Sequence, residues 1–118
     1  MAIQHYFGGC QCGAVRFEVD LDLDDTMTCN CSRCGRLGTI LTFAPAGAFT
    51  LKKGEGAMTE YLFNKHRIQH LFCATCGVES FARGTKLDGT AVVAVNARTL
   101  DGVDLSSLKP IANDGAST

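Results

Sequence analysis

Along most of the chain, apolar and polar residues alternate in short runs, which is the pattern of β-strands with one buried face. Val15, Phe17 and Val19 alternate with charged neighbours, and residues 91–95 form a continuous apolar run short enough for a buried strand. No segment keeps a helical period over three turns, so we expect little helix. Pro45 should end one strand, because proline has no N–H to donate to a sheet. The expected strands cover residues 15–19, 39–43, 48–52, 58–63, 66–72, 78–82 and 91–95.

These strands are closely spaced, and no linker or change of composition divides the chain. A length of 118 residues suits one domain with a modest hydrophobic core. We therefore predict a single mostly-β domain over residues 1–118, built from several antiparallel sheets. The tail from about residue 106 should be loose, because chain ends are ordered only where something holds them.

Charge and cysteine usage narrow the class of protein. The 11 basic and 12 acidic residues nearly balance, so the chain lacks the broad positive field that binds nucleic acid or anionic membranes. No apolar run reaches the roughly 18 residues of a membrane helix, and the first residues lack the basic and apolar regions of a signal peptide. An odd number of cysteines at chelating spacings fits a reducing compartment. These features predict a cytoplasmic protein with neither nucleic-acid nor membrane partners.

The strongest chemical signal is the clustering of the seven cysteines. Zinc binds thiolates in tetrahedral sites that are often built from cysteine pairs close in sequence. Seven ligands divide naturally into a closed set of four and an open set of three. The three clusters are Cys10-x-Cys12, Cys29-x-Cys31-x-x-Cys34 and Cys73-x-x-Cys76.

The last cluster, followed directly by Gly77, has the spacing of a zinc knuckle. Adding Cys10 and Cys12 would complete a four-thiolate site that ties the start of the chain to the middle of the sheet. The alternatives for Cys73 and Cys76 are a buried cysteine pair or a redox motif, and the latter expects a βαβ context that is absent here.

The central cluster, Cys29, Cys31 and Cys34, differs because three thiolates leave one tetrahedral position open for water or substrate. Three thiolates on Zn²⁺ carry a net negative charge, which damps the acidity of the metal and suits binding of a soft anion such as a thiolate. One alternative is a closed site, with a histidine as the fourth ligand. Another is a reactive cluster without metal. The candidate histidines are His5, His66 and His70.

Spacing defines these clusters but does not show which of them share a metal. A resemblance to a known family implies how the cysteines divide between sites. The chain resembles the glutathione-dependent formaldehyde-activating enzyme family, which includes centromere protein V, in the segments GGCQCGAVRF (8–17), CNCSRC (29–34), FCATCG (72–77) and VNARTLD (95–101). All seven cysteines have counterparts in that family. The resemblance implies a zinc-stapled β-tent fold with two zinc ions. It implies structural zinc on Cys10, Cys12, Cys73 and Cys76, and catalytic zinc on Cys29, Cys31 and Cys34.

The resemblance also implies a reaction. Members of the family join glutathione and formaldehyde as S-(hydroxymethyl)glutathione, a carbon–sulfur lyase type of activity. The expected product is this compound or a related adduct of a thiol and an aldehyde. The expected partners are therefore a small thiol, with glutathione as co-substrate, and an aldehyde. Glutathione carries two carboxylates, and Arg33 and Arg36 are the nearest cations in sequence, with a second basic group at residues 65–67. His70 alternates with Ile68 and Phe72, so we expect it in the core or among the groups around the metal ligands, and not as a proton shuttle.

Two departures from the family pattern concern the central cluster. Asn30 stands where the family often has histidine, and Gly35 stands where it commonly has a basic residue. Neither removes a ligand, but both change the groups around the cluster.

Two other functions fit the cysteines. A non-catalytic zinc-binding interaction module would need only the four-cysteine site, which leaves the central cluster without a role. A thiol-based redox sensor would lose zinc and form a disulfide within the central cluster under mild oxidant.

Overall fold

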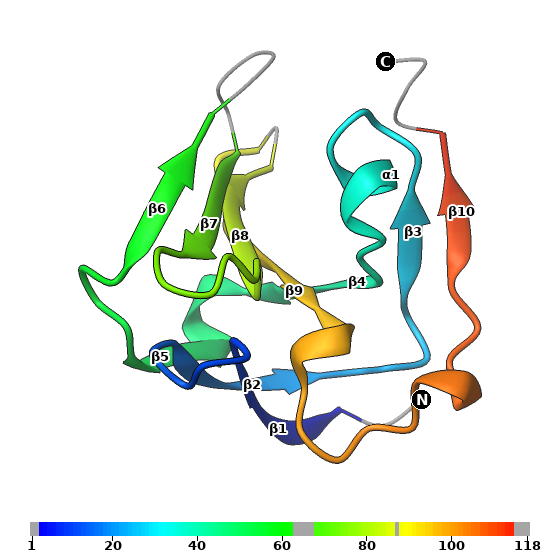
Figure 1. The fold of residues 1–118 in the computed structure, drawn as a ribbon. Helices are drawn as coiled ribbons and strands as arrows, with labels where there is room; N and C mark the ends of the chain where they lie inside the picture. Colours follow the sequence, from blue (N-terminus) through cyan, green and yellow to red (C-terminus); the bar gives the residue numbers. More distant parts are fainter. Residues whose placement is uncertain (1–2, 63–67, 87, 115–118) are drawn as a thin grey trace.

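The computed structural model describes residues 3–62, 68–86 and 88–114, and in these residues the fold is mostly β (Figure 1). One short helix and three single-turn 3-10 helices accompany the strands. The strands are β1 (Gln4–Gly9), β2 (Arg16–Leu21), β3 (Met27–Cys29), β4 (Leu41–Pro45), β5 (Phe49–Lys53), β6 (Met58–Tyr61), β7 (Gln69–Cys73), β8 (Phe81–Thr85), β9 (Ala91–Asn96) and β10 (Ile111–Asn113). The helix is α1 (Cys34–Leu37), and the 3-10 helices are Ala46–Ala48, Ala97–Thr99 and Leu105–Ser107.

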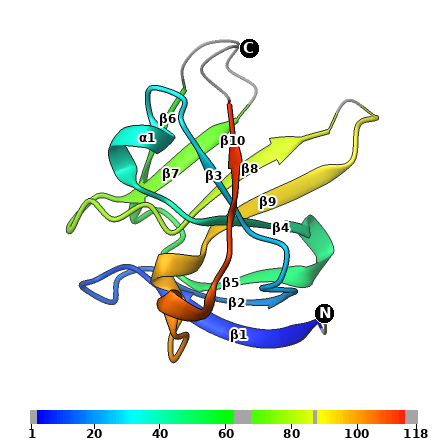
Figure 2. The same cartoon turned by 90° about the vertical axis from the view of Figure 1, so that its right-hand side faces the viewer.

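The strands form two sheets. A three-stranded sheet in the order β1-β2-β5 lies at the base of the view in Figure 1. A seven-stranded sheet in the order β10-β3-β4-β9-β8-β7-β6 rises from it, with β3 and β10 on one side and β6, β7 and β8 on the other (Figures 1 and 2). Among these strands every pairing is antiparallel except that of β10 with β3, which is parallel. The prediction of a single mostly-β domain is confirmed.

The core lies between the two sheets and follows from the period-two pattern. On β2, Phe17 and Val19 are buried while the residue between them is only partly covered, as the alternation predicted. Phe81 on β8 crosses from the larger sheet to the smaller one. Its ring centroid lies 4.6 Å from that of Phe49 and 6.0 Å from that of Phe17. Val95, from the apolar run of β9, is fully buried beside them.

Several boundaries differ from the sequence-based expectation. Strand β1 was not predicted, because its apolar Phe7 faces outward and is 52% exposed. The strand expected at 78–82 begins only at Phe81, because the Val78 carbonyl accepts from the Cys73 N–H and so belongs to the turn after β7. Part of the strands expected at 58–63 and 66–72 lies outside the described residues.

The expectation of a loose tail from about residue 106 is wrong for the residues up to 113. Residues 111–113 form β10, which pairs in register with β3. The Ile111 N–H also donates to the Thr26 carbonyl at 3.0 Å. Residues 111–113 are exposed and are held by backbone hydrogen bonds, whereas Leu108 before them packs against the core.

The described residues contain no helix long and apolar enough to cross a membrane.

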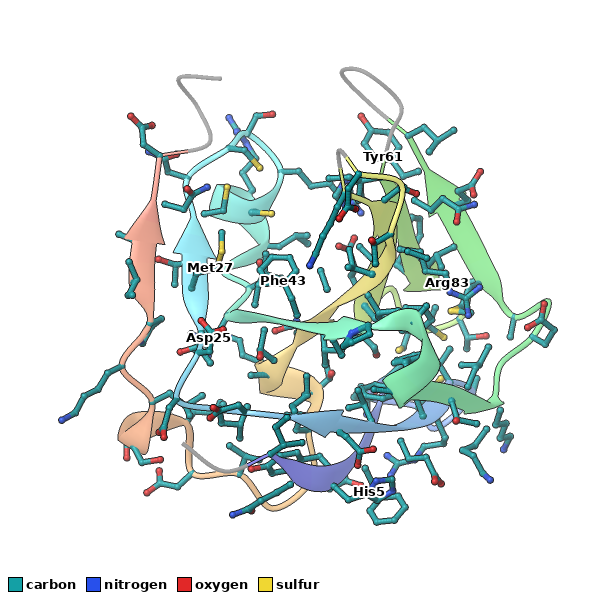
Figure 3. The ribbon with its side chains drawn as sticks, turned by 180° about the vertical axis from the view of Figure 1, so that it is seen from behind. His5, Asp25, Met27, Phe43, Tyr61 and Arg83 are labelled. Carbon is teal, nitrogen blue, oxygen red and sulfur yellow. The ribbon has the colours of Figure 1, made fainter. Side chains whose placement is uncertain are left out.

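His5 on β1 gives a first testable prediction (Figure 3). Its Nδ1 lies 2.7 Å from Asp20 Oδ1 and its Nε2 lies 3.2 Å from Glu18 Oε1. The hydrogen bond with Asp20 raises the pKa of His5 above its usual value of 6.5. A raised pKa in the folded state means that the protonated histidine stabilises the fold at low pH, and that this contribution disappears as pH rises through the folded-state pKa.

We therefore expect an NMR titration to give His5 a pKa above 6.5. His5→Gln should destabilise the protein more at about pH 6 than at about pH 8, as measured by denaturant unfolding. Equal losses at both pH values would contradict this interpretation.

Candidate metal centres

Four cysteines from two distant parts of the chain meet in one cluster, here named the four-thiol cluster. All four sulfurs lie within 4.8 Å of one another, and Cys12 Sγ lies 3.7 Å from Cys10 Sγ and 3.6 Å from Cys73 Sγ. A tetrahedral zinc with Zn–S bonds of about 2.3 Å requires sulfur–sulfur separations of about 3.8 Å. The donor set and its spacing therefore fit zinc. The members are Cys10, Cys12, Cys73 and Cys76.

Two tight turns bring these sulfurs together. Cys10 and Cys12 lie in the loop of the β1–β2 hairpin, which the Cys10 N–H closes by donating to the Val15 carbonyl at 3.1 Å. Gly77 follows the other pair with a φ of 81°, a left-handed conformation that costs glycine little. Backbone N–H groups also point at the sulfurs: Val15 donates to Cys10 Sγ at 3.2 Å. Such N–H···S contacts are typical surroundings of metal-bound thiolates.

The electrostatics of this cluster favour a cation among the thiols. Backbone hydrogen bonds from Val78 and Cys12 lower the pKa of the Cys76 thiol to about 6, which favours its thiolate form. A thiolate in contact with other thiols opposes their ionisation by like-charge repulsion. A bound Zn²⁺ removes that obstacle, because a thiol that coordinates it is deprotonated.

The remaining cysteines form a second group, here named the three-thiol cluster, with sulfurs again within 4.8 Å of one another. In the part of the chain that the structure describes, no histidine, aspartate or glutamate joins these three sulfurs. His5 lies against Asp20, and His70 is buried against Glu79, as expected for a core histidine. His66 lies outside the described residues. The three thiols come from the end of β3 (Cys29), the following turn (Cys31) and the start of α1 (Cys34).

One helical turn sets the geometry of this cluster. The Cys34 N–H donates to Cys31 Sγ at 3.3 Å, and the Gly35 N–H donates to the Cys31 carbonyl at 2.9 Å. Although burial opposes ionisation of Cys31, hydrogen bonding from the Cys34 backbone lowers the pKa of its thiol. Burial raises the pKa of the Cys34 thiol to about 12, and the neighbouring Cys31 adds to the shift. A thiol with a lowered pKa, Cys31, therefore lies beside a thiol with a raised pKa, Cys34.

The end of the chain adds further contacts, which the sequence did not reveal. Asn113 Nδ2 donates to Cys29 Sγ at 3.7 Å, and the Asn113 carbonyl accepts from the Asn30 N–H at 3.2 Å. The Asn30 side chain, which departs from the family pattern, donates to Asp114 Oδ1 at 3.0 Å. At Gly35 an added Cβ would meet Asn30 at an ordinary 3.6 Å, so space does not demand glycine there.

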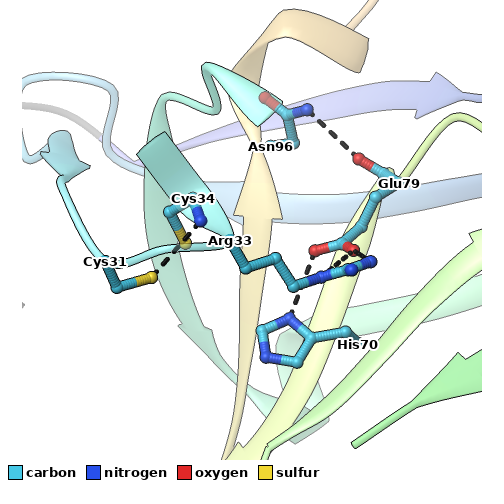
Figure 4. A network of polar contacts seen from close by, with 6 residues as sticks. All are labelled: Cys31, Arg33, Cys34, His70, Glu79 and Asn96. Carbon is cyan, nitrogen blue, oxygen red and sulfur yellow. Dashed lines mark hydrogen bonds and ion pairs between the residues drawn. The ribbon is translucent and has the colours of Figure 1, made fainter. Parts of the chain in front are cut away.

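A buried polar network lies beside the three-thiol cluster (Figure 4). Arg33 donates to Glu79, whose other carboxylate oxygen lies 3.4 Å from His70 Nδ1. The Arg33 guanidinium also lies over the Tyr61 ring, 4.6 Å from its centroid. Sequence reasoning missed Glu79. The signal was a single acidic residue in the otherwise uncharged stretch between Cys76 and Arg83.

A pocket of about 440 Å³ opens beside the turn that carries the three-thiol cluster. Arg36 at this pocket is exposed, and its Nη1 donates to the Ser32 carbonyl at 2.9 Å. The second basic group expected from the sequence, at 65–67, lies outside the described residues. The pocket is lined by Ser32, Arg33, Arg36, Leu37 and Tyr61.

Comparison with known proteins identifies the family. The family model for glutathione-dependent formaldehyde-activating enzymes matches residues 5–114. The chain belongs to this family. The resemblance noted in the sequence is therefore confirmed.

A crystal structure of a Rhodobacter sphaeroides protein is similar to this member of the formaldehyde-activating family, with 31% sequence identity and a TM-score of 0.80. The match covers 90% of this chain and 97% of that chain. Family membership associates the fold with glutathione-dependent formaldehyde activation, and the two cysteine clusters are groups that could hold metal ions.

Proposed function

We propose that this chain is a zinc-dependent enzyme of the carbon–sulfur lyase type, which joins glutathione and formaldehyde as S-(hydroxymethyl)glutathione or forms a related thiol–aldehyde adduct. The observation that carries this proposal is the three-thiol cluster on a turn whose Ser32 and Arg33 line a pocket, in a chain of the formaldehyde-activating family. In this proposal the four-thiol cluster holds a structural zinc. The catalytic zinc is held by Cys29, Cys31 and Cys34.

Cys29, Cys31 and Cys34 would hold the zinc through three thiolates, and the metal would supply one open tetrahedral position and favour the thiolate form of a substrate thiol. The bond changes in the reaction are small. The glutathione sulfur adds to the formaldehyde carbon, the π electrons of the carbonyl move to oxygen, and the oxygen takes up the proton that the thiol released. The contribution of the protein is therefore mainly to hold the two reactants together in the right orientation.

Among the cations that the structure describes, Arg36 is best placed to bind a glutathione carboxylate, because it lines the pocket, is exposed and carries N–H donors besides the Nη1 that donates to the Ser32 carbonyl. Leu37 and Tyr61 offer apolar surface on the same pocket. Arg33 lines it too, but part of its guanidinium is already engaged by Glu79. We therefore assign substrate binding chiefly to Arg36.

The three-thiol cluster also argues against a purely structural module, which would use only the four-thiol cluster. The chain has seven cysteines, an odd number, and they stand at metal-chelating spacings. Such cysteine usage fits a reducing compartment better than a disulfide framework, so we place the protein in the cytoplasm.

Exchange NMR on glutathione mixed with formaldehyde tests this function, with zinc counted on the same samples. We expect exchange between glutathione and its adduct to be faster with the wild type than in buffer or with zinc salt alone. In Cys31→Ser the rate should fall back to that of buffer, because the cluster loses a ligand, and one of two zinc ions should be lost.

Other outcomes would contradict the proposal in different ways. Two zinc ions without any acceleration would exclude formaldehyde and glutathione as the reactants of this site. One zinc ion without acceleration would favour the interaction module instead.

A further inference from the structure

A buried ion pair connects the three-thiol cluster to the opposite side of the larger sheet (Figure 4). Arg33 Nε and Nη2 donate to Glu79 Oε1 at 3.2 and 2.5 Å. The two side chains are 20% and 7% exposed. A carboxylate buried this deeply is strongly unfavourable without a paired cation, so the pair is a fixed feature of the fold.

The position of the Glu79 carboxylate is set by the sheet and not by the cysteine turn. Its Oε2 lies 3.4 Å from Nδ1 of His70 on β7, and its backbone carbonyl accepts from Asn96 Nδ2 on β9 at 3.1 Å. The segment that carries it begins at the four-thiol cluster, where the Cys73 N–H donates to the Val78 carbonyl at 3.1 Å. Glu79 is therefore a fixed anchor.

Arg33, in contrast, belongs to the turn that carries the thiols. It is the residue before Cys34, and its carbonyl accepts from the Leu37 N–H at 3.0 Å in the first turn of α1. Its guanidinium lies between Glu79 and two rings, 4.6 Å from the centroid of Tyr61 and 5.9 Å from that of Phe72. Fixing this side chain fixes the backbone between Cys31 and Cys34.

We propose that Glu79 is a positioning residue for the three-thiol cluster, which acts through Arg33 to hold the Cys31–Cys34 turn in the geometry that binds metal. This inference rests on the proposed metal binding by that cluster and not on the formaldehyde reaction. It also gives Arg33 a role within the protein in place of direct contact with substrate. Partners that orient metal ligands in this way usually change metal affinity by about 10- to 100-fold.

The test uses Glu79→Gln in the full chain loaded with ¹¹³Cd²⁺, which replaces zinc and gives a separate NMR signal for each thiolate site. Glutamine keeps the size of the side chain but replaces a charge-assisted ion pair by a weaker neutral contact. By competition with a chelator, we expect the metal affinity of the three-thiol cluster to fall about 10- to 100-fold. The affinity of the four-thiol cluster should stay unchanged.

Glu60→Gln is the matched control. Glu60 on the exposed side of β6 accepts from Gln69 Nε2 at 2.5 Å, so the same chemical change is made away from the cysteine turn. We expect this variant to keep both affinities. Arg33→Gln combined with Glu79→Gln completes a double-mutant cycle, and the pair should lose no more affinity than either single variant, because both remove one interaction.

Four results would overturn the proposal. Unchanged affinity of the three-thiol cluster in Glu79→Gln would exclude positioning, and additive losses in the cycle would show that Glu79 does not act through Arg33. A parallel loss at both clusters would show a general structural role instead. A wild-type protein that binds cadmium only at the four-thiol cluster would overturn the metal proposal and this inference together. If the wild type binds cadmium at both clusters and only the Glu79→Gln prediction fails, the metal proposal stands and the role of Glu79 alone is excluded.

Discussion

Cys73→Ser is expected to leave the domain unfolded. Cys73 is 1% exposed, and its sulfur accepts from the backbone N–H groups of Thr75 and Cys76 at 3.4 Å. Structural zinc binds zinc-finger peptides with an apparent free energy of about 10–16 kcal/mol. This is as large as the whole net stability of a typical domain, about 5–15 kcal/mol. Loss of one ligand from the four-thiol cluster should therefore remove most of the folding free energy.

Circular dichroism and zinc counting by native mass spectrometry check this prediction. The matched control is Cys29→Ser, which makes the same substitution in the three-thiol cluster, at the end of a strand near the edge of the sheet. We expect it to keep the fold and one zinc ion. A Cys73→Ser protein that melts at the wild-type temperature would show that the four-thiol cluster does not hold the fold together.

Phe81→Ala is expected to be the most destabilising change in the apolar core. Phe81 is 1% exposed on β8, and it packs against Phe17 and Phe49 from the smaller sheet. Removing the ring takes away its contacts with Phe17 and Phe49 and leaves a cavity, which costs about 3–5 kcal/mol. The control is Phe43→Ala on β4, where the side chain is 50% exposed and the loss should be about 1 kcal/mol or less.

Denaturant unfolding of the zinc-loaded proteins gives both values. The midpoint of Phe81→Ala should fall with little change in the slope, because the surface exposed on unfolding stays similar. Equal midpoints for the two alanine variants would mean that the aromatic contact between the sheets contributes little.

The elements with a clear alternation or apolar run were predictable. Residues 91–95 lie in β9, and Phe17 and Val19 are buried on β2, because burial of one face leaves its period in the sequence. The two cysteine groups were also predictable, since ligand spacing and the family resemblance identify the same members that the structure brings together.

What the sequence missed depends on contacts between distant residues. Glu79 meets Arg33 across 46 positions, and although Glu79 is the single acidic residue between Cys76 and Arg83, nothing in the local sequence identifies Arg33 as its partner. Strand β10 is exposed at all three residues, so it leaves no apolar signal and is ordered through the backbone of β3. Strand β1 was missed for a related reason, because its outward face carries Phe7 as well as polar residues.

The position of β10 has a consequence for how this protein family can diversify. The strand carries Asn113, which touches Cys29, yet none of its residues is buried. Mutations there are therefore free of the packing constraints that govern the core. Random drift in this short segment could alter the properties of the three-thiol cluster while the fold and all seven cysteines stay the same. Relatives with identical ligands could then differ in metal affinity or thiol preference through their last strand alone.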